Sequence, residues 1–265
     1  MAQDARDLSG HSLLAVFAHP DDESLACGGL LAWCAARGVR VSVLCLTRGE
    51  SGPGAGDPKL PRRRAEELDA AARVLGIGTV ELLSYPDGSL QWLGARGEDL
   101  EVDIAHAIQA HRPDVVVTFD KDGLYWHPDH IAVHEWTTAA IASLGAAAPA
   151  LYYVTLPRGA IRSVVDSAMR LSPADPASRN VFGLADPDAF GAEAPAPTLV
   201  IDTGEYAMRK IAALRCHRSQ VSGGAFSVLP EADAARCLRF EHLRRSPLGP
   251  ADDTFIERFA TDSPS

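Results

Sequence analysis

Several features that would point to other classes of protein are scarce in this sequence of 265 residues. It has five cysteines, an odd number, and none of them forms a CxxC or CxxH pair. This spacing excludes a disulfide-stapled scaffold or a cysteine zinc finger and predicts reduced cysteines in the core. Basic residues are also few, with 25 Lys and Arg against 35 Asp and Glu and a formal charge of -10. Because phosphate binding needs a concentrated positive face, we expect no nucleic-acid partner.

Long apolar runs are absent as well. The first apolar run, residues 13–17, is too short for a membrane span and follows a polar, partly acidic segment unlike that of a signal peptide. We therefore expect a cytoplasmic protein that does not bind membranes. No GxGxxG motif follows this run, which argues against a dinucleotide-binding module, and the sequence has no internal repeat.

What the sequence does contain is a regular alternation of short apolar runs and helical periodicity. Strands are predicted over 13–17, 39–46, 79–83, 114–119, 151–155 and 198–202. Helices are predicted over 25–37, 62–75, 100–111, 130–144, 205–218 and in a final stretch over 230–244. Alternating strands and helices are typical of a mostly parallel sheet with helices on both faces. The prediction is an α/β, Rossmann-like, doubly wound fold.

The chain is short enough to form a single α/β domain over residues 1–265. Two regions stand outside the alternation. Residues 172–197 are rich in Pro, Ala and Asp and predict an inserted loop or lid, and residues 221–265 predict a helical C-terminal extension. A second flexible loop, rich in Gly and Pro, is expected over 49–61.

Two segments concentrate side chains that bind metals. The run AHPDDE, from Ala18 to Glu23, follows the first predicted strand, and the run YWHPDH, from Tyr125 to His130, follows the fourth. Ligands in open α/β sheets bind at the carboxyl ends of the strands. His19 and Asp22 can supply two ligands from one turn and the second run a third, which leaves zinc an open position for water. The pattern predicts a catalytic zinc site.

Each segment taken alone also has a structural interpretation. Acidic residues favour helix N-termini, so Asp21, Asp22 and Glu23 could simply begin the next helix. The run His127 to His130 could likewise be a helix start with proline in its first turn. The occurrence of both segments at strand ends favours the metal site.

With these motifs in view, the sequence resembles the zinc-dependent PIG-L/LmbE-type deacetylases. That family removes N-acyl groups from glucosamine-type sugars and from sugar-containing thiol conjugates. The resemblance rests on AHPDDE and on HPDH at 127–130, and extends to Arg-x-Glu-Glu at 64–67, Pro-Asp-Gly at 86–88 and a Lys and His-x-Ser-Gln helix at 210–220. Residues 172–197 and the C-terminal tail have no counterpart in this pattern.

The resemblance implies a role for each matched residue. Zn2+ would be held by His19, Asp22 and His130, with Asp21 as the general base. His127 would stabilise the oxyanion or protonate the leaving amine, with Asp129 as its orienting partner. Tyr125 would polarise the amide carbonyl, and Arg64 and Asp87 would bind the sugar. His217, Ser219 and Gln220 would line the cleft, with helix capping as the alternative, and His134 lies one helical turn beyond His130.

The expected function is a metal-dependent N-deacetylase that removes an N-acyl group, above all N-acetyl, from a small amino-sugar substrate. An amidase for a sugar–thiol conjugate is the alternative within the family. A non-haem iron enzyme would use the same two histidines and carboxylate, but the extra carboxylate of Asp21 argues against it. A sugar- or nucleotide-binding module without activity is a third interpretation. A homo-oligomer is compatible with the sequence.

Overall fold

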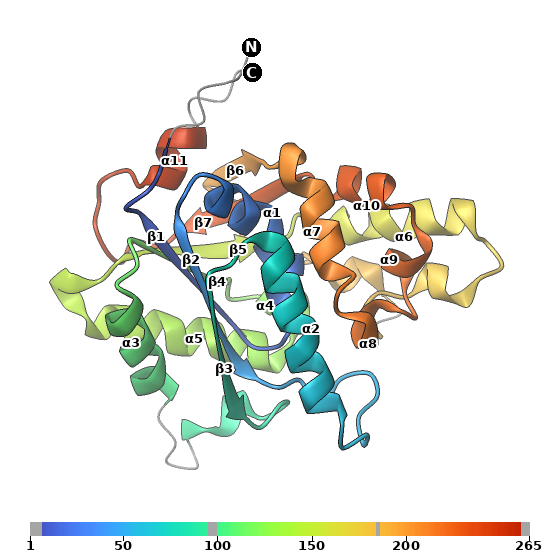
Figure 1. Ribbon diagram of the computed structural model, residues 1–265, viewed down its shortest axis with the longest axis horizontal. Helices are drawn as coiled ribbons and strands as arrows, with labels where there is room; N and C mark the ends of the chain where they lie inside the picture. Colours follow the sequence, from blue (N-terminus) through green and yellow to red (C-terminus); the bar gives the residue numbers. More distant parts are fainter. Residues whose placement is uncertain (1–6, 95–99, 184–185, 261–265) are drawn as a thin grey trace.

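Seven strands form one sheet in a computed structural model that describes residues 7–94, 100–183 and 186–260 (Figure 1). The strand order is β3-β2-β1-β4-β5-β7-β6. The strands are β1 Ser12–Phe17, β2 Arg40–Thr47, β3 Thr79–Tyr85, β4 Val115–Phe119, β5 Ala150–Thr155, β6 Leu199–Asp202 and β7 Phe240–Arg245. Strands β1 to β5 pair in parallel, whereas β7 runs antiparallel to both of its neighbours. The predicted mostly parallel, Rossmann-like sheet is confirmed.

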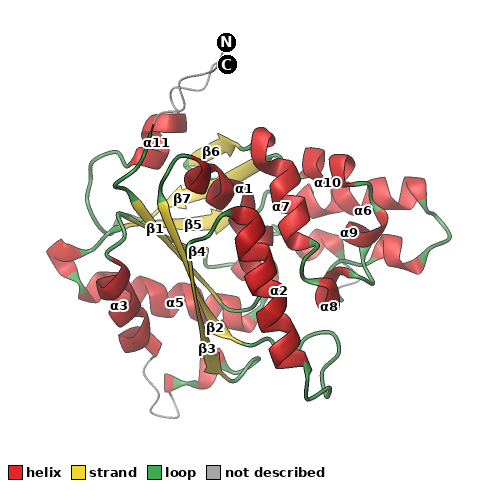
Figure 2. Cartoon of the chain, viewed as in Figure 1, coloured by secondary structure: helices red, strands yellow, loops and turns green. Residues whose placement is uncertain are grey.

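Helices cover both faces of the sheet (Figure 2). Helices α1 (Asp22–Ala36), α2 (Leu60–Leu75) and α7 (Ala207–Leu214) pack together on one face, and α3 (Leu100–His111) packs on α5 (Pro128–Ser143) on the other. Strands covered on both sides need apolar residues throughout, and every residue of β1, β4 and β5 is buried. This explains why their sequences read as continuous apolar runs.

The C-terminal region corrects one prediction. The helical stretch predicted over 230–244 ends early: α10 spans Glu231–Cys237, and the next residues form strand β7 between β5 and β6. Burial alternates along the first four residues of its sequence FEHLRR, with Glu241 and Leu243 buried. The charged Glu241 at a buried position breaks the apolar pattern by which a strand is predicted from sequence. In the fold, the Glu241 carboxylate accepts hydrogen bonds from Lys210 Nζ of α7 at 2.9 and 3.0 Å.

A group of short helices lies beside α7, outside the sheet (Figure 1). It contains α6 (Ala160–Leu171), for which the sequence analysis predicts no element, together with α9 (Ala225–Val228) and α10. The described part of 172–197 includes the 3-10 turns Pro176–Arg179, which packs on α6 and α9, and Pro187–Ala189. The remaining helices are α4 Gly123–Trp126, α8 Arg218–Val221 and α11 Phe255–Ala260.

The topology brings the two metal-binding segments together. Strands β1 and β4 are neighbours in the sheet, and their carboxyl ends lead into the segments at 18–23 and 120–130. In chain order, β2 and β3 extend the sheet on one side of β1, and the strands from β4 onward extend it on the other side. Such a switch point is where open α/β sheets bind ligands.

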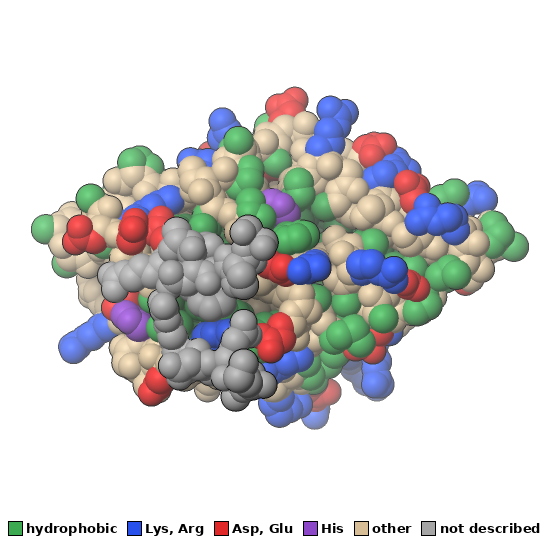
Figure 3. All heavy atoms as spheres, turned by 90° about the horizontal axis from the view of Figure 1, so that it is seen from above, with side chains coloured by type: hydrophobic (Ala, Val, Ile, Leu, Met, Phe, Trp, Pro, Cys, Tyr) green, Lys and Arg blue, Asp and Glu red, His purple; other side chains and the backbone are tan. Residues whose placement is uncertain are grey.

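None of the helices in the described ranges is both long and apolar enough to cross a bilayer. On the face shown in Figure 3, Lys and Arg side chains lie among Asp and Glu side chains.

Candidate active site

Two turns with unusual backbone angles form the floor of the site. The first, after β1, is tied to β2 because Thr47 donates from its backbone N–H and its hydroxyl to the Ala18 carbonyl, both at 2.9 Å. Within it Asp21 has φ 124°, and in the second turn Leu124 and Trp126 have φ near 65°. Positive φ at non-glycine residues costs roughly 1–3 kcal/mol each and concentrates at functional sites. Both turns thus have the strain expected at such a site.

Three side chains from these turns converge on one point. His19 Nδ1 and His130 Nε2 lie 3.2 Å apart, Asp22 Oδ2 lies 3.4 Å from His19 Nδ1, and Asp22 Oδ1 lies 3.3 Å from His130 Nε2. In a tetrahedral zinc site with bonds of about 2.0–2.1 Å, ligand atoms are separated by about 3.3–3.4 Å. The Asp22 carboxylate meets the two histidine nitrogens through different oxygens, and all three contacts have the length expected between ligands of one zinc ion.

The opposite nitrogen of each histidine faces an oxygen acceptor. His19 Nε2 lies 2.9 Å from Asp87 Oδ1, and His130 Nδ1 lies 3.1 Å from the Gly123 carbonyl. In the neutral form of each ring, these contacts assign the proton to the nitrogen that faces oxygen, which leaves His19 Nδ1 and His130 Nε2 to bind a metal ion. Metal-binding histidines are typically oriented in this way by a carboxylate or a carbonyl. A close approach at Gly123 makes the second contact possible, since a Cβ there would lie 3.0 Å from that of His130.

The electrostatics of these donors favour a cation. Burial lowers the pKa of His19, but hydrogen bonds with Asp129, Asp22 and Asp87 outweigh it and raise that pKa well above its usual value. Burial raises the pKa of Asp22, but His130 and His19 outweigh it and hold that pKa well below its usual value. The negative charge that favours a proton on His19 would equally favour a metal ion. Two looser sets, His19 with His127 and His130, and His19 with Asp87 and Asp129, have donors within 4.8 Å.

The structure corrects the expected partner of His127. The Asp129 carboxylate is fully buried and accepts the N–H groups of Gly88 at 2.7 Å and Leu90 at 3.0 Å, and it lies 3.3 Å from His19 Nε2. His127 contacts only the backbone of Asp129, whose N–H donates to His127 Nδ1 at 3.2 Å. The reason is that His127 caps α5 at Asp129, which turns the carboxylate toward His19. Asp129 thus supports His19, one of the candidate metal ligands.

Asp87 also lies beside His19, although the sequence suggested a sugar-binding role for it. Its Oδ2 accepts the Ser51 N–H at 2.7 Å, so both carboxylate oxygens have partners within the protein. We expect Asp87→Asn to weaken zinc binding about 10- to 100-fold, as substitutions behind metal-binding histidines do. Competition with a chelating dye measures this affinity. Wild-type zinc affinity in this variant would show that Asp87 does not support His19, whatever its effect on KM.

His127 is poised as a neutral hydrogen-bond donor. Burial, with His130 and His19 nearby, lowers the pKa of His127 to about 4. Because Nδ1 accepts the Asp129 N–H, the proton of the neutral ring is assigned to Nε2. The expected carboxylate partner is absent among the described contacts of His127, and this geometry gives a neutral N–H donor beside the candidate metal ligands.

A pocket of about 240 Å³ opens beside these donors. Its walls come from the two turns, the start of α1, the loops after β2 and β3, the α2 and α8 helices, and the segment 172–197. The lining residues are His19, Asp21, Asp22, Leu25, Ser51, Gly52, Pro53, Arg64, Asp87, Gly88, Tyr125, His127, Phe182 and Gln220. Tyr125 packs on Phe190 with ring centroids 4.6 Å apart. Most residues predicted from the sequence line the pocket. Four of them do not: Asp129, His130, His217 and Ser219.

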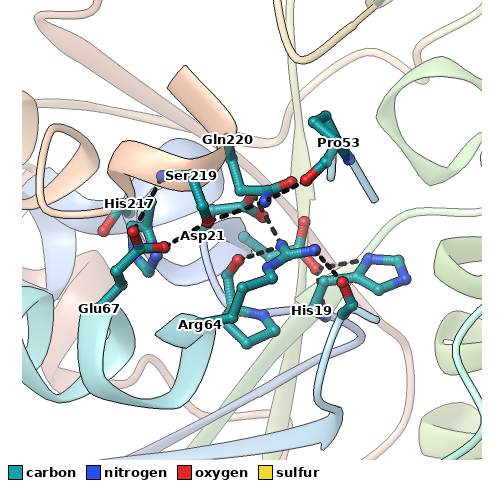
Figure 4. A network of polar contacts seen from close by, with 12 residues as sticks. His19, Asp21, Pro53, Arg64, Glu67, His217, Ser219 and Gln220 are labelled. Atoms are coloured by element: carbon teal, nitrogen blue, oxygen red, sulfur yellow. Dashed lines mark hydrogen bonds and ion pairs between the residues drawn. The ribbon is translucent and has the colours of Figure 1, made fainter. Parts of the chain in front are cut away.

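Arg64 is almost fully buried and connects three parts of the site (Figure 4). Its guanidinium donates to the carbonyls of Pro20 at 2.5 Å and Gly49 at 2.8 Å, and to Asp21 Oδ2 at 3.1 Å. Only glycine fits at position 49, where φ is +66° and a Cβ would lie 2.2 Å from Arg64 Nη1. Arg64 is therefore a buried part of the site and not a surface charge of α2.

The Asp21 carboxylate lines the pocket beside His19 and Asp22 and accepts a hydrogen bond from Arg64. Burial raises the pKa of Asp21 to about 6, although Arg64 opposes the shift. The two adjacent carboxylates thus differ: Asp22 stays ionised beside the histidines, and Asp21 is a stronger base than an ordinary aspartate. Such a separation of pKa values is typical of an active site in which the two carboxylates have different roles.

The residues of the 217–220 segment contact different parts of the structure. Gln220 lines the pocket, whereas Ser219 donates to Glu67 and the buried His217 contacts Glu23 (Figure 4). His134 bonds the Phe119 carbonyl at 3.0 Å. The sequence analysis missed Phe182 of the pocket wall and the inward role of Glu23. The last acid of AHPDDE was the available signal for Glu23, whereas the positive φ of 51° at Phe182 is visible only in the structure.

The PIG-L family, described as GlcNAc-PI de-N-acetylase, matches this sequence over residues 14–141. A 1D-myo-inositol 2-acetamido-2-deoxy-alpha-D-glucopyranoside deacetylase of Mycolicibacterium vanbaalenii is 35% identical over 233 residues, covering 79% of this chain and 81% of that protein. This chain belongs to the PIG-L family. PIG-L proteins are hydrolytic N-deacetylases, so the chain is an amide hydrolase and the predicted enzyme class is confirmed.

Two further comparisons agree with membership of the PIG-L family. An enzyme of the same name from Acidothermus cellulolyticus is 34% identical, with 91% of each chain covered. The solved structure of N,N'-diacetylchitobiose deacetylase from Pyrococcus horikoshii aligns with a TM-score of 0.63 at 18% identity, covering 93% of this chain and 87% of that one. At this identity the second comparison supports the fold, which this PIG-L protein shares.

Proposed function

We propose that this PIG-L protein is a zinc-dependent deacetylase that removes the N-acetyl group of a glucosamine-type sugar conjugate. The observation that carries the proposal is the convergence of His19, Asp22 and His130 at 3.2–3.4 Å, with Asp21 beside them in one pocket. A zinc ion held by these three residues would acidify a water molecule and polarise the acyl carbonyl. An iron oxygenase with the same ligands would have no use for a separate base.

Asp21 is the general base in this proposal. Its carboxylate lies in the pocket, and its raised pKa allows it to accept a proton from water near neutral pH. The same carboxyl group then donates that proton to the leaving nitrogen as the amide C–N bond breaks. The products are a free amine and acetate, and Asp21 returns to its ionised form.

His127 and Tyr125 act on the carbonyl oxygen. The Nε2–H of a neutral His127 and the hydroxyl of Tyr125 are both donors at the pocket wall. Burial, reinforced by Asp22 and Asp21, raises the pKa of Tyr125 well above its usual value, so its hydroxyl keeps its proton. Donors aimed at the developing oxyanion are worth about 10²–10³ in rate each.

The size of the pocket limits the substrate. Pockets for drug-sized ligands are typically about 300–1,000 Å³, whereas this one is about 240 Å³. It therefore suits one acetamido sugar ring, with the rest of the conjugate outside, against the loop at 51–53 and Phe182. In this proposal Arg64 and Asp87 contact the sugar from the pocket wall in addition to their contacts within the protein. The inositol glucosaminide named for the two relatives has this form.

The proposal is tested by amine release from a panel of acetamido sugars supplied to the zinc-loaded enzyme. The panel contains N-acetylglucosamine, its inositol glycoside, N,N'-diacetylchitobiose and a sugar–thiol conjugate. We expect the inositol glycoside to give the highest kcat/KM. Preference for the thiol conjugate would select the amidase alternative, and no amine from any member would contradict the proposed substrate class.

A further inference from the structure

Glu23 and His217 form a buried pair directly behind Asp21. Their side chains are 1% and 0% exposed, and His217 Nε2 lies 2.8 Å from Glu23 Oε1. Burial raises the pKa of Glu23 and lowers that of His217, but in each case the partner outweighs burial and favours the charged form. The pair joins residues 194 positions apart, from the starts of helices α1 and α8.

The second oxygen of Glu23 reaches the backbone of Asp21. Glu23 Oε2 accepts the Asp21 N–H at 3.0 Å, and this is the residue whose φ is 124°. The hydrogen bond fixes the peptide plane before Asp21, while Arg64 Nη2 holds its carboxylate at 3.1 Å from the other side. Asp21 is therefore held by hydrogen bonds at both its backbone N–H and its carboxylate.

We propose that His217 is a positioning residue for Asp21, acting through Glu23. This inference rests on the proposed role of Asp21 as the base. Within the described part of the chain, His217 Nδ1 has no hydrogen-bond partner, so the polar contact of this side chain is the one to Glu23. His217 orients the Glu23 carboxylate, and Glu23 in turn holds Asp21 in the strained backbone conformation that directs its carboxylate into the pocket.

Two substitutions of His217 separate this role from simple packing. Glutamine places its amide N–H near the position of Nε2 and keeps the bond to Glu23, whereas asparagine places it near Nδ1 and loses the bond. Because a small misplacement of a reacting group can cost about 100-fold, we expect His217→Asn to lower kcat by about that factor. KM, zinc content and the fold should be near those of wild type, and His217→Gln should recover most of the rate.

A double-mutant cycle with Asp21→Asn identifies the route of the effect. If His217 acts through Asp21, His217→Asn should cause no further loss of kcat once Asp21 has been replaced. An additive loss of kcat in the double variant would overturn the proposal, as would loss of zinc from His217→Asn alone. If His217→Asn does not fold, Glu23→Gln replaces it in the same cycle.

Glu241→Gln is the matched control. Glu241 is also buried, pairs with Lys210, and accepts an α1 backbone N–H, that of Gly29 at 2.8 Å, but it does not contact Asp21. Glu241→Gln should lower the melting temperature without changing kcat. A fall in kcat equal to that caused by His217→Asn would show that His217→Asn acts by general destabilisation. An unchanged kcat in Asp21→Asn would instead refute the proposed function, which keeps the two failures distinct.

Discussion

Asp21→Asn is expected to lower kcat by about 10²–10⁴-fold, the contribution typical of a general base. Asparagine keeps the shape of the side chain and tolerates positive φ, so the strained turn at φ 124° should persist. It cannot accept a proton. Zinc content should stay near that of wild type because Asp22, His19 and His130 supply the metal-binding atoms. The measurement is steady-state amine release together with metal analysis of the same sample.

The matched control is Asp57→Asn, an exposed carboxylate that pairs with Arg63 on the surface. It loses one negative charge without contact to the pocket and should leave kcat unchanged. Loss of zinc from Asp21→Asn would show that Asp21 is itself a metal ligand and would overturn the division of roles between the two adjacent aspartates.

The second large effect separates the two histidines of the HPDH motif. His130→Ala should weaken zinc binding by more than the roughly 10–100-fold typical of residues behind the ligands. His127→Ala should instead lower kcat by about 10²–10³-fold, the value of one oxyanion donor, and keep the metal. The difference follows from the geometry, since His130 Nε2 faces His19 and Asp22, whereas His127 lines the pocket.

Zinc affinity and kcat measured on both variants test this separation. His130 stacks on Phe119 with ring centroids 4.0 Å apart, so His130→Gln, which fills more of that space, accompanies the alanine variant. Melting curves identify any variant that is merely unfolded. Wild-type zinc affinity in both His127→Ala and His130→Ala would show that the proposed coordination is wrong.

The sequence was sufficient for the parallel part of the fold because each of these strands reads as a local apolar run. Strand β1 and the AHPDDE turn that follows it are contiguous, so the position of His19 and Asp22 at a strand end could be inferred directly. The placement of His130 followed from β4 lying beside β1. The structure also shows why both the capping and the metal-site interpretations were reasonable: α1 begins at Asp22 and α5 begins after His127.

Other features depend on tertiary contacts that leave little trace in the sequence. Strand β7 contains Glu241, whose burial is explained by Lys210 of α7 and the Gly29 N–H of α1. The direction of the Asp129 carboxylate could not be inferred from the sequence. The motif at 127–130 reads the same whether His127 caps the helix at the Asp129 N–H or pairs with the Asp129 carboxylate. Helix α6 is different: its buried positions Ile161, Val164, Val165 and Ala168 follow a helical period, so this signal was present in the sequence.

The most direct test of the whole account is a zinc titration of the chelator-stripped enzyme, with amine release followed on the inositol glycoside of N-acetylglucosamine. The account predicts that the stripped protein is inactive and that activity returns in proportion to added zinc, reaching its maximum at one equivalent per chain. Full activity after the metal has been removed, or restoration only by iron together with oxygen consumption, would contradict it.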